Sequence, residues 1–435
     1  MKRWLVILLV LLALIILVSP GIVGRLAEKN IAQNIEWAEG DSPGVTIKTE
    51  SFERGWFTSE GRHRVVIEGG RFRDVTEKYT EATGNPELPS LIIDTHLDHG
   101  PLPISSMAPG LASTVSTFQV DPGNGVPIEI PGKLTSQVGL TGSTDSYLLL
   151  EAGSFEHEDT SFEWQGVDMT VATNPGSGAI SVDGEIKPWK ITGEGTVADF
   201  GAITITANQV KSDFGFSVGS VEMEMGPITI DDNASVFSIA GLSLSADSAI
   251  DDARLNAHTV FGMQTMTIPA VGEVDFTVDL SLEGMDAASI RVIGKALQDA
   301  QGEPDPEAAL AALYPEIEDE LQTLFRKGFS VTVEPLDVSL PQGVLATRLE
   351  VDVPESNDSA DFNWASVLLG MTASLDLRVP GAIYEMAAMM NAQAGSLVAM
   401  GILKPDGEDY VLEAEYAQGL INVNGAPMPI PIPGM

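Results

Sequence analysis

The sequence contains no cysteine among its 435 residues and has few basic residues. The absence of cysteine excludes disulfide scaffolds, thiol catalysis and cysteine-ligated zinc. Lysine and arginine number 23 against 62 aspartate and glutamate residues, so the formal net charge is −39. Because phosphate backbones are bound by clustered basic side chains, this balance argues against a nucleic-acid partner. The 5 histidines leave little room for a histidine-rich metal site.

The composition otherwise indicates a folded and strongly acidic protein. Hydrophobic residues make up 44% of the chain, which excludes a wholly disordered protein despite the charge. A chain of this length suggests two or three domain-sized units. Repulsion among the carboxylates lowers stability in dilute buffer, and salt relieves it by screening. We therefore hypothesise a halophilic or marine source.

The one long apolar run lies at the N-terminus, from Trp4 to Val18, after two basic residues. As a helix over residues 4–24 it would span about 31 Å, enough for the hydrocarbon core of a bilayer. The basic residues before it predict a cytoplasmic N-terminus, with everything after residue 25 across the membrane. A cleaved signal peptide is the alternative, but the proline in Ser19-Pro20-Gly21 disfavours cleavage there. We predict a retained single-pass anchor.

Beyond residue 40 the dominant pattern is alternation of apolar and polar residues with a period of two. Strands of this kind bury one face and expose the other to water, which is typical of antiparallel sheets. Glycine after Asp or Asn predicts turns between such strands. The clearest alternating segments are 203–206, 221–225, 274–282 and 345–353. The clearest turns are Asp183-Gly184, Asp406-Gly407, Gln418-Gly419 and Asn424-Gly425.

More than a dozen predicted strands between residues 60 and 283 favour a large curved sheet over a small sandwich. Helical spacing appears at 286–300, at 307–327, where Pro315 is expected to kink or divide the helix, and at Pro380–Leu403. The predicted fold class is therefore mainly β (α+β). It combines an N-terminal transmembrane helix, a large curved antiparallel assembly and a few packed helices in the C-terminal third.

Three stretches carry a resemblance to a known family. They are Phe52-Glu53-Arg54-Gly55-Trp56-Phe57-Thr58-Ser59, Asp98-His99-Gly100-Pro101-Leu102-Pro103 and Tyr416-Ala417-Gln418-Gly419-Leu420-Ile421-Asn422-Val423-Asn424-Gly425. They resemble, in order and spacing, the Tyr/Phe-x-Arg-Gly-x-Phe-x-Ser segment, the Asp-His-Gly-Pro-Phe-Pro turn and the closing hairpin of the YdgA-like bacterial domain-of-unknown-function family. The resemblance implies a Gram-negative envelope protein on the inner membrane that faces the periplasm and has no established activity.

The predicted organisation combines the anchor, the sheet and the helices. The segments are an anchor at 1–25, a β-rich periplasmic region at 26–284, a helical insertion at 285–330, an α+β region at 331–425 that completes the sheet, and a proline-rich tail at 426–435. With no catalytic motif and no predicted cofactor, the first hypothesis is a non-catalytic envelope protein. It binds or scaffolds a periplasmic partner, and one version presents an apolar sheet face to lipid acyl chains.

One cluster supports an alternative function. On a strand, Asp94, His96 and Asp98 share a face, so two carboxylates and an imidazole would meet at one ion, next to His99. Such ligands suit zinc or manganese, which predicts a periplasmic metal-dependent hydrolase. The other interpretation is a strand with a polar outer face that ends in a turn at His99-Gly100-Pro101.

Arg54, Trp56 and Phe57 are the candidate interaction residues. Arginine and tryptophan are favoured anchors at protein interfaces, which indicates a docking site. Alternatively, the two aromatic side chains cover the sheet near its membrane end, with Arg54 solvated or paired.

Overall fold

The computed structural model describes most of the chain after residue 43. The described residues are 44–67, 88–100, 110–121, 123, 126–157, 160–193, 195–268, 272–301, 306–356 and 362–429. The predicted anchor at 1–25 lies outside them, as do residues 101–103 of the second resemblance segment and residues 430–435 of the predicted tail. In the part of the chain that the structure describes, no helix has the length and apolarity needed to cross a membrane.

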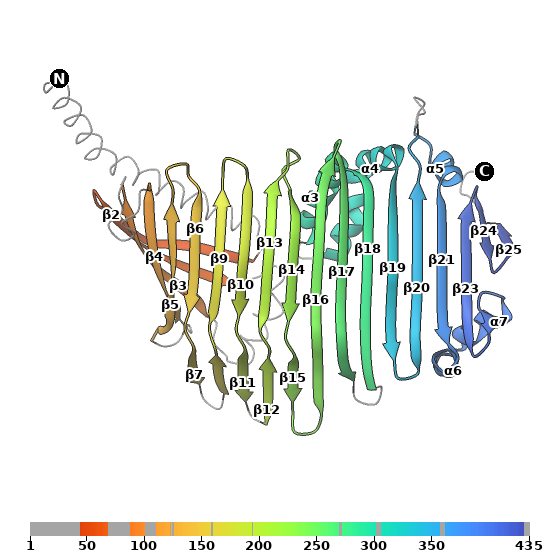
Figure 1. The fold of residues 1–435 in the computed structure, drawn as a ribbon, viewed down its shortest axis with the longest axis horizontal. Helices are drawn as coiled ribbons and strands as arrows, with labels where there is room; N and C mark the ends of the chain where they lie inside the picture. The colour runs from red at the N-terminus through yellow and green to blue at the C-terminus, as the bar shows by residue number, and fades with distance from the viewer. Residues whose placement is uncertain are drawn as a thin grey trace, which may run out of the picture. The chain divides into compact units, whose positions relative to one another are not determined.

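The chain divides into two compact units, each built on antiparallel strand pairs. Unit 1 comprises Met1–Phe155, Glu163–Lys187 and Asp299–Ala309, and unit 2 comprises Glu156–Phe162, Pro188–Gln298 and Leu310–Met435. Figure 1 shows the strands of each unit running side by side. The prediction of a mainly β, antiparallel protein is confirmed.

Unit 1 is an antiparallel ladder in which each strand pairs with the next in the order given. Its strands are β1 (Val45–Arg54), β2 (Thr58–Ile67), β3 (Ser90–His99), β4 (Ala112–Asp121), β5 (Ile128–Val138), β6 (Thr144–Leu150), β9 (Val167–Asn174) and β10 (Ala179–Ile186). The turn predicted at Asp183-Gly184 is wrong, because both residues lie inside β10. Gly184 serves packing there instead, since a Cβ at this position would lie 2.8 Å from Cγ of Met169 on β9.

Unit 2 is a longer antiparallel ladder, again paired in the order given. Its strands are β13 (Ile203–Lys211), β14 (Ser217–Met225), β16 (Val236–Asp251), β17 (Arg254–Ile268), β18 (Gly272–Asp286), β19 (Phe329–Leu340), β20 (Gly343–Val353), β21 (Thr372–Pro380), β23 (Asp409–Ala417), β24 (Leu420–Val423) and β25 (Ala426–Pro429). Shorter strands accompany the ladders: β7 (Gly153–His157), β8 (Thr160–Trp164), β11 (Trp189–Gly193), β12 (Thr196–Phe200), β15 (Ile228–Asp231) and β22 (Lys404–Asp406).

The turn chemistry of the last hairpins agrees with the sequence prediction. Asn424 and Gly425 connect β24 to β25 with φ of 51° and 82°, the positive values that a two-residue hairpin turn requires. Gln418 and Gly419 connect β23 to β24 in the same way. The start of the predicted extended tail is therefore a paired strand, β25.

Five helices are present among the described residues, all in the last part of the chain as predicted. They are α3 (Ala287–Gln301), α4 (Pro306–Lys327), α5 (Trp364–Gly370), α6 (Gly381–Met390) and α7 (Ala392–Ala399). Pro315 does not divide α4, which continues through it. Leu313 and Ile317 on either side are buried, and their packing offsets the one backbone hydrogen bond that proline removes.

The single helix predicted over Pro380–Leu403 is instead two helices that meet at Asn391. The N–H of Asn391 donates to the carbonyl of Ala387 and ends α6, while its side-chain oxygen accepts from the N–H of Gln393 at 2.9 Å and begins α7. An asparagine that satisfies the first turn of a new helix competes with continuing the old one. Figure 1 shows α6 and α7 near one end of β21 and β23, and α5 near the other end.

Candidate functional site

Three of the four predicted metal ligands on β3 share one face, but charged side chains of β2 contact two of them. The Arg62 Nε lies 3.0 Å from Oδ1 of Asp94, which sits directly opposite it on β3. The imidazole of His96 lies between two carboxylates, with Nε2 3.4 Å from Asp98 Oδ1 and Nδ1 3.7 Å from Glu60 Oε1. Asp94 is therefore bound to an arginine rather than directed at an ion with the other two.

His99 points to the opposite face of the same strand. It is buried, with 2% of its surface exposed, and its Nε2 lies 3.2 Å from the Oγ of the buried Ser59. Its backbone N–H donates to the carbonyl of Phe57 at 2.8 Å. Among the described residues, no group of three or more histidine, aspartate or glutamate side chains is placed to hold a metal ion. The contacts of His99 join the first two resemblance segments to each other.

The candidate interaction residues lie at the turn between β1 and β2. Trp56 and Phe57 have 56% and 46% of their surface exposed, so these two aromatic rings present large areas to solvent. The turn is closed by the N–H of Gly55, which donates to the carbonyl of Thr58 at 2.8 Å. A Cβ at Gly55 would approach that carbonyl oxygen to 2.8 Å, so the turn requires glycine. Arg54 ends β1 immediately before it.

The strand registers show where an apolar sheet face of the kind expected from the sequence lies: it extends across unit 2. In the registers of the ladder, most apolar residues stand opposite apolar residues, for example Met223 with Leu244 and Leu349 with Leu375. Thr347 on β20 is an exception, because it stands opposite Leu336 and Leu377. We define the apolar face by Ile203, Ile205, Met223, Met225, Leu242, Leu244, Phe261, Met263, Phe276, Val278, Leu280, Val333, Leu336, Val338, Leu345, Leu349, Leu375, Leu377, Leu412 and Ala414.

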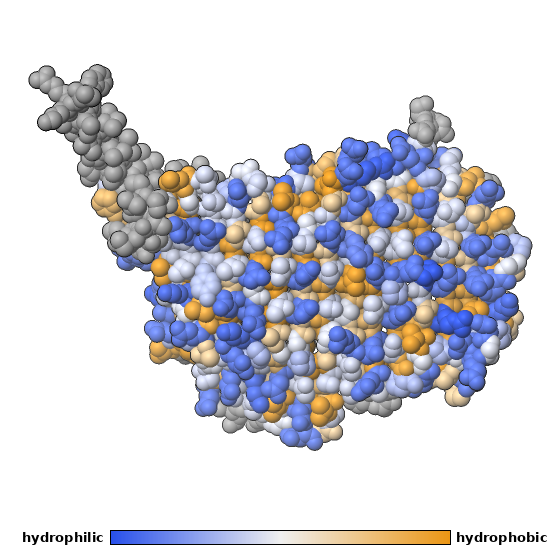
Figure 2. Space-filling model, viewed as in Figure 1, coloured by the Kyte–Doolittle hydropathy of each residue, from blue (hydrophilic) through white to orange (hydrophobic). Residues whose placement is uncertain are grey.

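The opposite positions of the same strands are mostly polar, and acidic residues are the most frequent there, although Val260, Arg348 and Arg378 also lie on this face. We define this polar face by Thr204, Thr206, Glu222, Glu224, Ser243, Ser245, Thr277, Asp279, Asp337, Glu350, Asp376, Glu413 and Glu415. Unit 2 is thus an amphipathic sheet across nine strands from β13 to β23. Figure 2 views the molecule from one side, where hydrophilic side chains lie among hydrophobic ones over these strands.

The side chains of the apolar face are not covered as a protein core would be. All of them are half-buried except Phe261, which is 36% exposed, and none is fully buried. Among the described residues, helices contact this face toward its ends. At one end Val379, Ile383 and Leu403 form a buried cluster under α6 and α7. At the other end the Tyr416 hydroxyl donates to the carbonyl of Leu368 on α5 at 2.6 Å.

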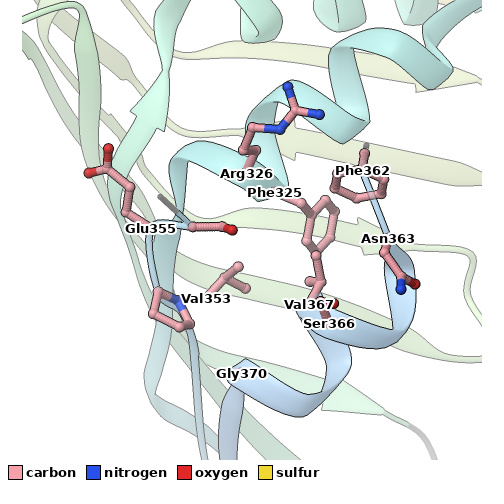
Figure 3. A pocket seen from close by; sticks show the side chains of 11 residues that line it. Phe325, Arg326, Val353, Glu355, Phe362, Asn363, Ser366, Val367 and Gly370 are labelled. Atoms are coloured by element: carbon pink, nitrogen blue, oxygen red, sulfur yellow. The ribbon is translucent and has the colours of Figure 1, made fainter. Parts of the chain in front are cut away.

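A cavity of about 230 Å³ lies at this second end, between the end of α4, the end of β20 and α5. Figure 3 shows Phe325 and Val353 inside it, with Arg326 above them. Its full lining is Phe325, Arg326, Val353, Pro354, Glu355, Ser356, Phe362, Asn363, Ser366, Val367 and Gly370. The cavity therefore combines an apolar interior with a polar rim.

Comparison with known proteins gives the family. The model of a family of bacterial proteins of unknown function, DUF945, matches residues 1–431 of this chain. The chain belongs to the DUF945 family. The resemblance that the three segments indicated is confirmed.

Among curated proteins, this DUF945 chain is similar to Protein YdgA of Escherichia coli strain K12. The two are 22% identical over 201 residues, which cover 41% of this chain and 39% of YdgA. The match thus spans well under half of the relative's length. No solved structure matches the chain.

The three segments that resemble the family lie at turns and at a strand end in this DUF945 chain. The first forms the β1–β2 turn, the described part of the second ends β3, and the third forms the β23–β24 hairpin. The sequence led us to expect an apolar sheet face for lipid, but not which residues form it, because each strand shows only its own alternation. The sequence signal for the apolar face was the alternation of apolar and polar residues in many successive strands. The strand registers were needed to show which apolar residues lie side by side.

Proposed function

We propose that this protein is a non-catalytic protein of the bacterial envelope that binds lipid acyl chains on the apolar face of unit 2. The observation that carries the proposal is the extent of that face across nine strands, with its side chains half-buried and none fully buried. Soluble proteins rarely leave large contiguous apolar areas in water, because such areas drive association. An occupant is therefore expected.

The composition of the face favours an aliphatic occupant. Leucine, valine, isoleucine and methionine make up most of it, and the strand backbone is already paired within the ladder. Protein interfaces instead concentrate binding energy in tryptophan, tyrosine and arginine. A surface made mostly of aliphatic side chains suits hydrocarbon, which needs burial and no hydrogen bond.

The dimensions of the face also suit an acyl chain. Between Leu345 and Val353, β20 rises about 26 Å at the usual rise per residue. One leaflet of a bilayer takes about half of a 30 Å hydrocarbon core, or about 15 Å. A single strand is therefore long enough for an extended acyl chain to lie along it.

The proposal includes a position on the inner membrane, with the body in the periplasm. The apolar run from Trp4 to Val18, preceded by two basic residues, supports this part. A protein anchored in the bilayer would meet lipid without having to extract it from a distant compartment.

Site-specific photocrosslinking in native membranes tests the proposal. A photoreactive amino acid is placed in the full-length protein at Leu244 or Leu349, in cells whose phospholipids carry ³²P. The matched controls are Ser245 and Glu350, the next residues on the same strands, whose side chains point to the polar face. We expect labelled lipid to be captured at Leu244 and Leu349 at several times the level at the controls.

Two results would contradict the proposal. Equal labelling at all four positions would show that the apolar face has no preference for lipid. Capture of a second copy of the chain at Leu244 and Leu349, without label, would show that the face is a dimer interface.

A further inference from the structure

We infer that the cavity at the end of α4 binds the anionic headgroup of the lipid whose acyl chains lie on the apolar face. The inference rests on the proposed function and names its ligand class, an anionic phospholipid. Arg326 would contact the headgroup, and Asn363 and Ser366 would complete the polar rim. The argument depends on the position, size and charge of the cavity.

The interior of the cavity is the end of the apolar face. Val353 follows Leu349 and Val351 along the same face of β20 and pairs with Phe329 of β19. It is 3% exposed and lines the cavity together with Phe325. The Phe325 ring packs edge-on against Phe329, with centroids 5.1 Å apart. Hydrocarbon that lies along β20 would therefore reach the cavity without crossing polar surface.

The rim carries a cation and hydrogen-bond donors. The guanidinium carbon of Arg326 lies 5.8 Å from the centre of the Phe362 ring, and its side chain is exposed. Asn363 uses its side-chain oxygen to accept from the N–H of Ala365 at 2.9 Å, which leaves its amide NH₂ as a donor. A guanidinium beside neutral donors matches the geometry of a phosphate group.

The charges of the described residues leave Arg326 available to an anion. Within the described residues, no carboxylate forms an ion pair with it. Glu355 on the opposite wall is held by Arg254, whose Nη2 lies 3.2 Å from Glu355 Oε2. The adjacent Lys327 is bound to Asp286. The remaining negative charge of the protein is screened over about 8 Å at physiological ionic strength, so the rim can attract an anion despite it.

The size of the cavity limits what it can hold. Pockets that enclose a drug-sized ligand measure roughly 300–1,000 Å³, and this cavity of about 230 Å³ is smaller. It has room for a headgroup but not for the acyl chains, which must lie outside on the sheet. A free phosphate offers the same anionic chemistry without the chains, so the experiment has to separate the two sources.

Binding of short-chain lipids to the full-length protein in detergent tests the inference, with native mass spectrometry as the readout. The probes are dioctanoylphosphatidylglycerol, which is anionic, and dioctanoylphosphatidylcholine, which is zwitterionic. We expect the wild-type protein to prefer the anionic lipid about tenfold, the effect of one good charged hydrogen bond. R326Q should reduce the preference to about twofold or less, and R326K should retain part of it.

The matched control is R291Q, which removes the same charge from the exposed surface of α3. An equal loss of preference in R291Q and R326Q would show that only net charge matters and would overturn the inference. Absence of any preference in the wild-type protein would overturn it as well. Competition by inorganic phosphate at the concentration at which the anionic lipid binds would show a site for free anions instead.

Photocrosslinking at Leu349 distinguishes this inference from the proposed function. If R326Q still captures labelled lipid at Leu349 but has lost the anionic preference, both stand. If lipid capture fails in the wild-type protein while the Arg326-dependent preference persists, the acyl-chain proposal fails and the headgroup site stands alone. If capture succeeds and the preference does not depend on Arg326, the proposed function stands and the headgroup inference is wrong.

Discussion

His63 and Arg64 are neighbours on β2 whose side chains point to opposite faces of the sheet in unit 1. His63 is 7% exposed and its Nδ1 lies 3.0 Å from the Oγ1 of Thr49. Burial disfavours the charged imidazolium and lowers the pKa of His63. On the other face Arg64 binds Glu50 of β1 at 2.6 Å and Asp121 of β4 at 2.7 Å. These charge-assisted bonds raise the pKa of Arg64, so one side chain ties three strands together at any physiological pH.

The lowered pKa of His63 predicts that unit 1 loses stability in mild acid. As the pH falls, the unfolded chain binds a proton at this histidine at a higher pH than the folded chain does. The stability that the neutral imidazole of His63 contributes is therefore complete above the unfolded-state pKa of about 6.5 and is lost as the pH falls below it. Hydrogen exchange of the β2 amides should therefore accelerate between pH 7.5 and pH 5.5, after correction for intrinsic rates. H63Q, which hydrogen-bonds but does not titrate, should reduce this difference.

H258Q is the control, because His258 is half-exposed beside Asp279 in unit 2. It should leave the pH response of β2 unchanged. The same response in H63Q and wild-type protein would rule out His63 as its source.

At the scale of elements, Asp286 joins a strand to two helices. It ends β18, and its Oδ2 accepts from the N–H of Ser289 at 3.0 Å and from the Ser289 hydroxyl at 2.7 Å, which caps the start of α3. Its Oδ1 accepts from the ammonium of Lys327 at the end of α4. Burial acts to raise the pKa of Asp286, but the bonds from Lys327 and Ser289 outweigh it and hold that pKa below its usual value.

We expect D286N to lower the free energy of unfolding at pH 7 by about 1.5–3 kcal/mol, the range for hydrogen bonds to a charged group. The contribution of the carboxylate is present above the unfolded-state pKa of about 3.9 and is lost as the pH falls through the lower pKa of the folded state. Urea unfolding at pH 7 and pH 3 measures both effects. The free energies of unfolding of the wild-type protein and D286N should differ less at pH 3 than at pH 7. D319N, on the exposed surface of α4, is the control; a loss as large as that of D286N there would contradict the assignment.

Much of the secondary structure was predictable because it depends on local periodicity. The alternation over 274–282 and 345–353 lies within β18 and β20, and α3 and α4 begin within one residue of their predicted starts. Asn391 misled the helix prediction because its capping role competes with helix continuation, and the outcome depends on side-chain hydrogen bonds. The two-turn helix α5 was missed because its only start signal is Asn363 as N-cap.

The candidate site was less predictable than the strands. That Asp94, His96 and Asp98 share a face follows from the period of a strand, but their partners come from β2. Arg62 lies 32 residues from Asp94 in the sequence and becomes its neighbour only through the register of β2 and β3. The cavity at Arg326 depends on three elements meeting, which no local pattern records.

At the scale of whole units, the two faces of unit 2 have opposite requirements. The apolar face avoids water, and the polar face concentrates carboxylates that repel one another. Asp376 and Glu413 stand directly opposite on β21 and β23, an arrangement that destabilises a sheet when both residues are charged. Arg348 stands opposite Asp376 on β20, but its guanidinium is bound to Glu334. The chain has a net charge of −39, so such repulsion is a general property of the protein. Salt relieves the repulsion by screening, and solutes that are excluded from the protein surface also strengthen apolar burial.

We therefore expect the melting temperature of the protein to rise by at least about 5 °C from 0.05 M to 1 M NaCl, as the screening length falls to about 3 Å. E413Q removes one member of the opposed pair and should raise the melting temperature at low salt while reducing its dependence on salt. E316Q removes the same charge from the exposed surface of α4, away from the polar face, and should change both quantities less. Sucrose at matched osmolality controls for the effect of excluded solutes on burial. A melting temperature that is flat or falls with salt would refute the electrostatic account, and with it the hypothesis of a halophilic or marine source.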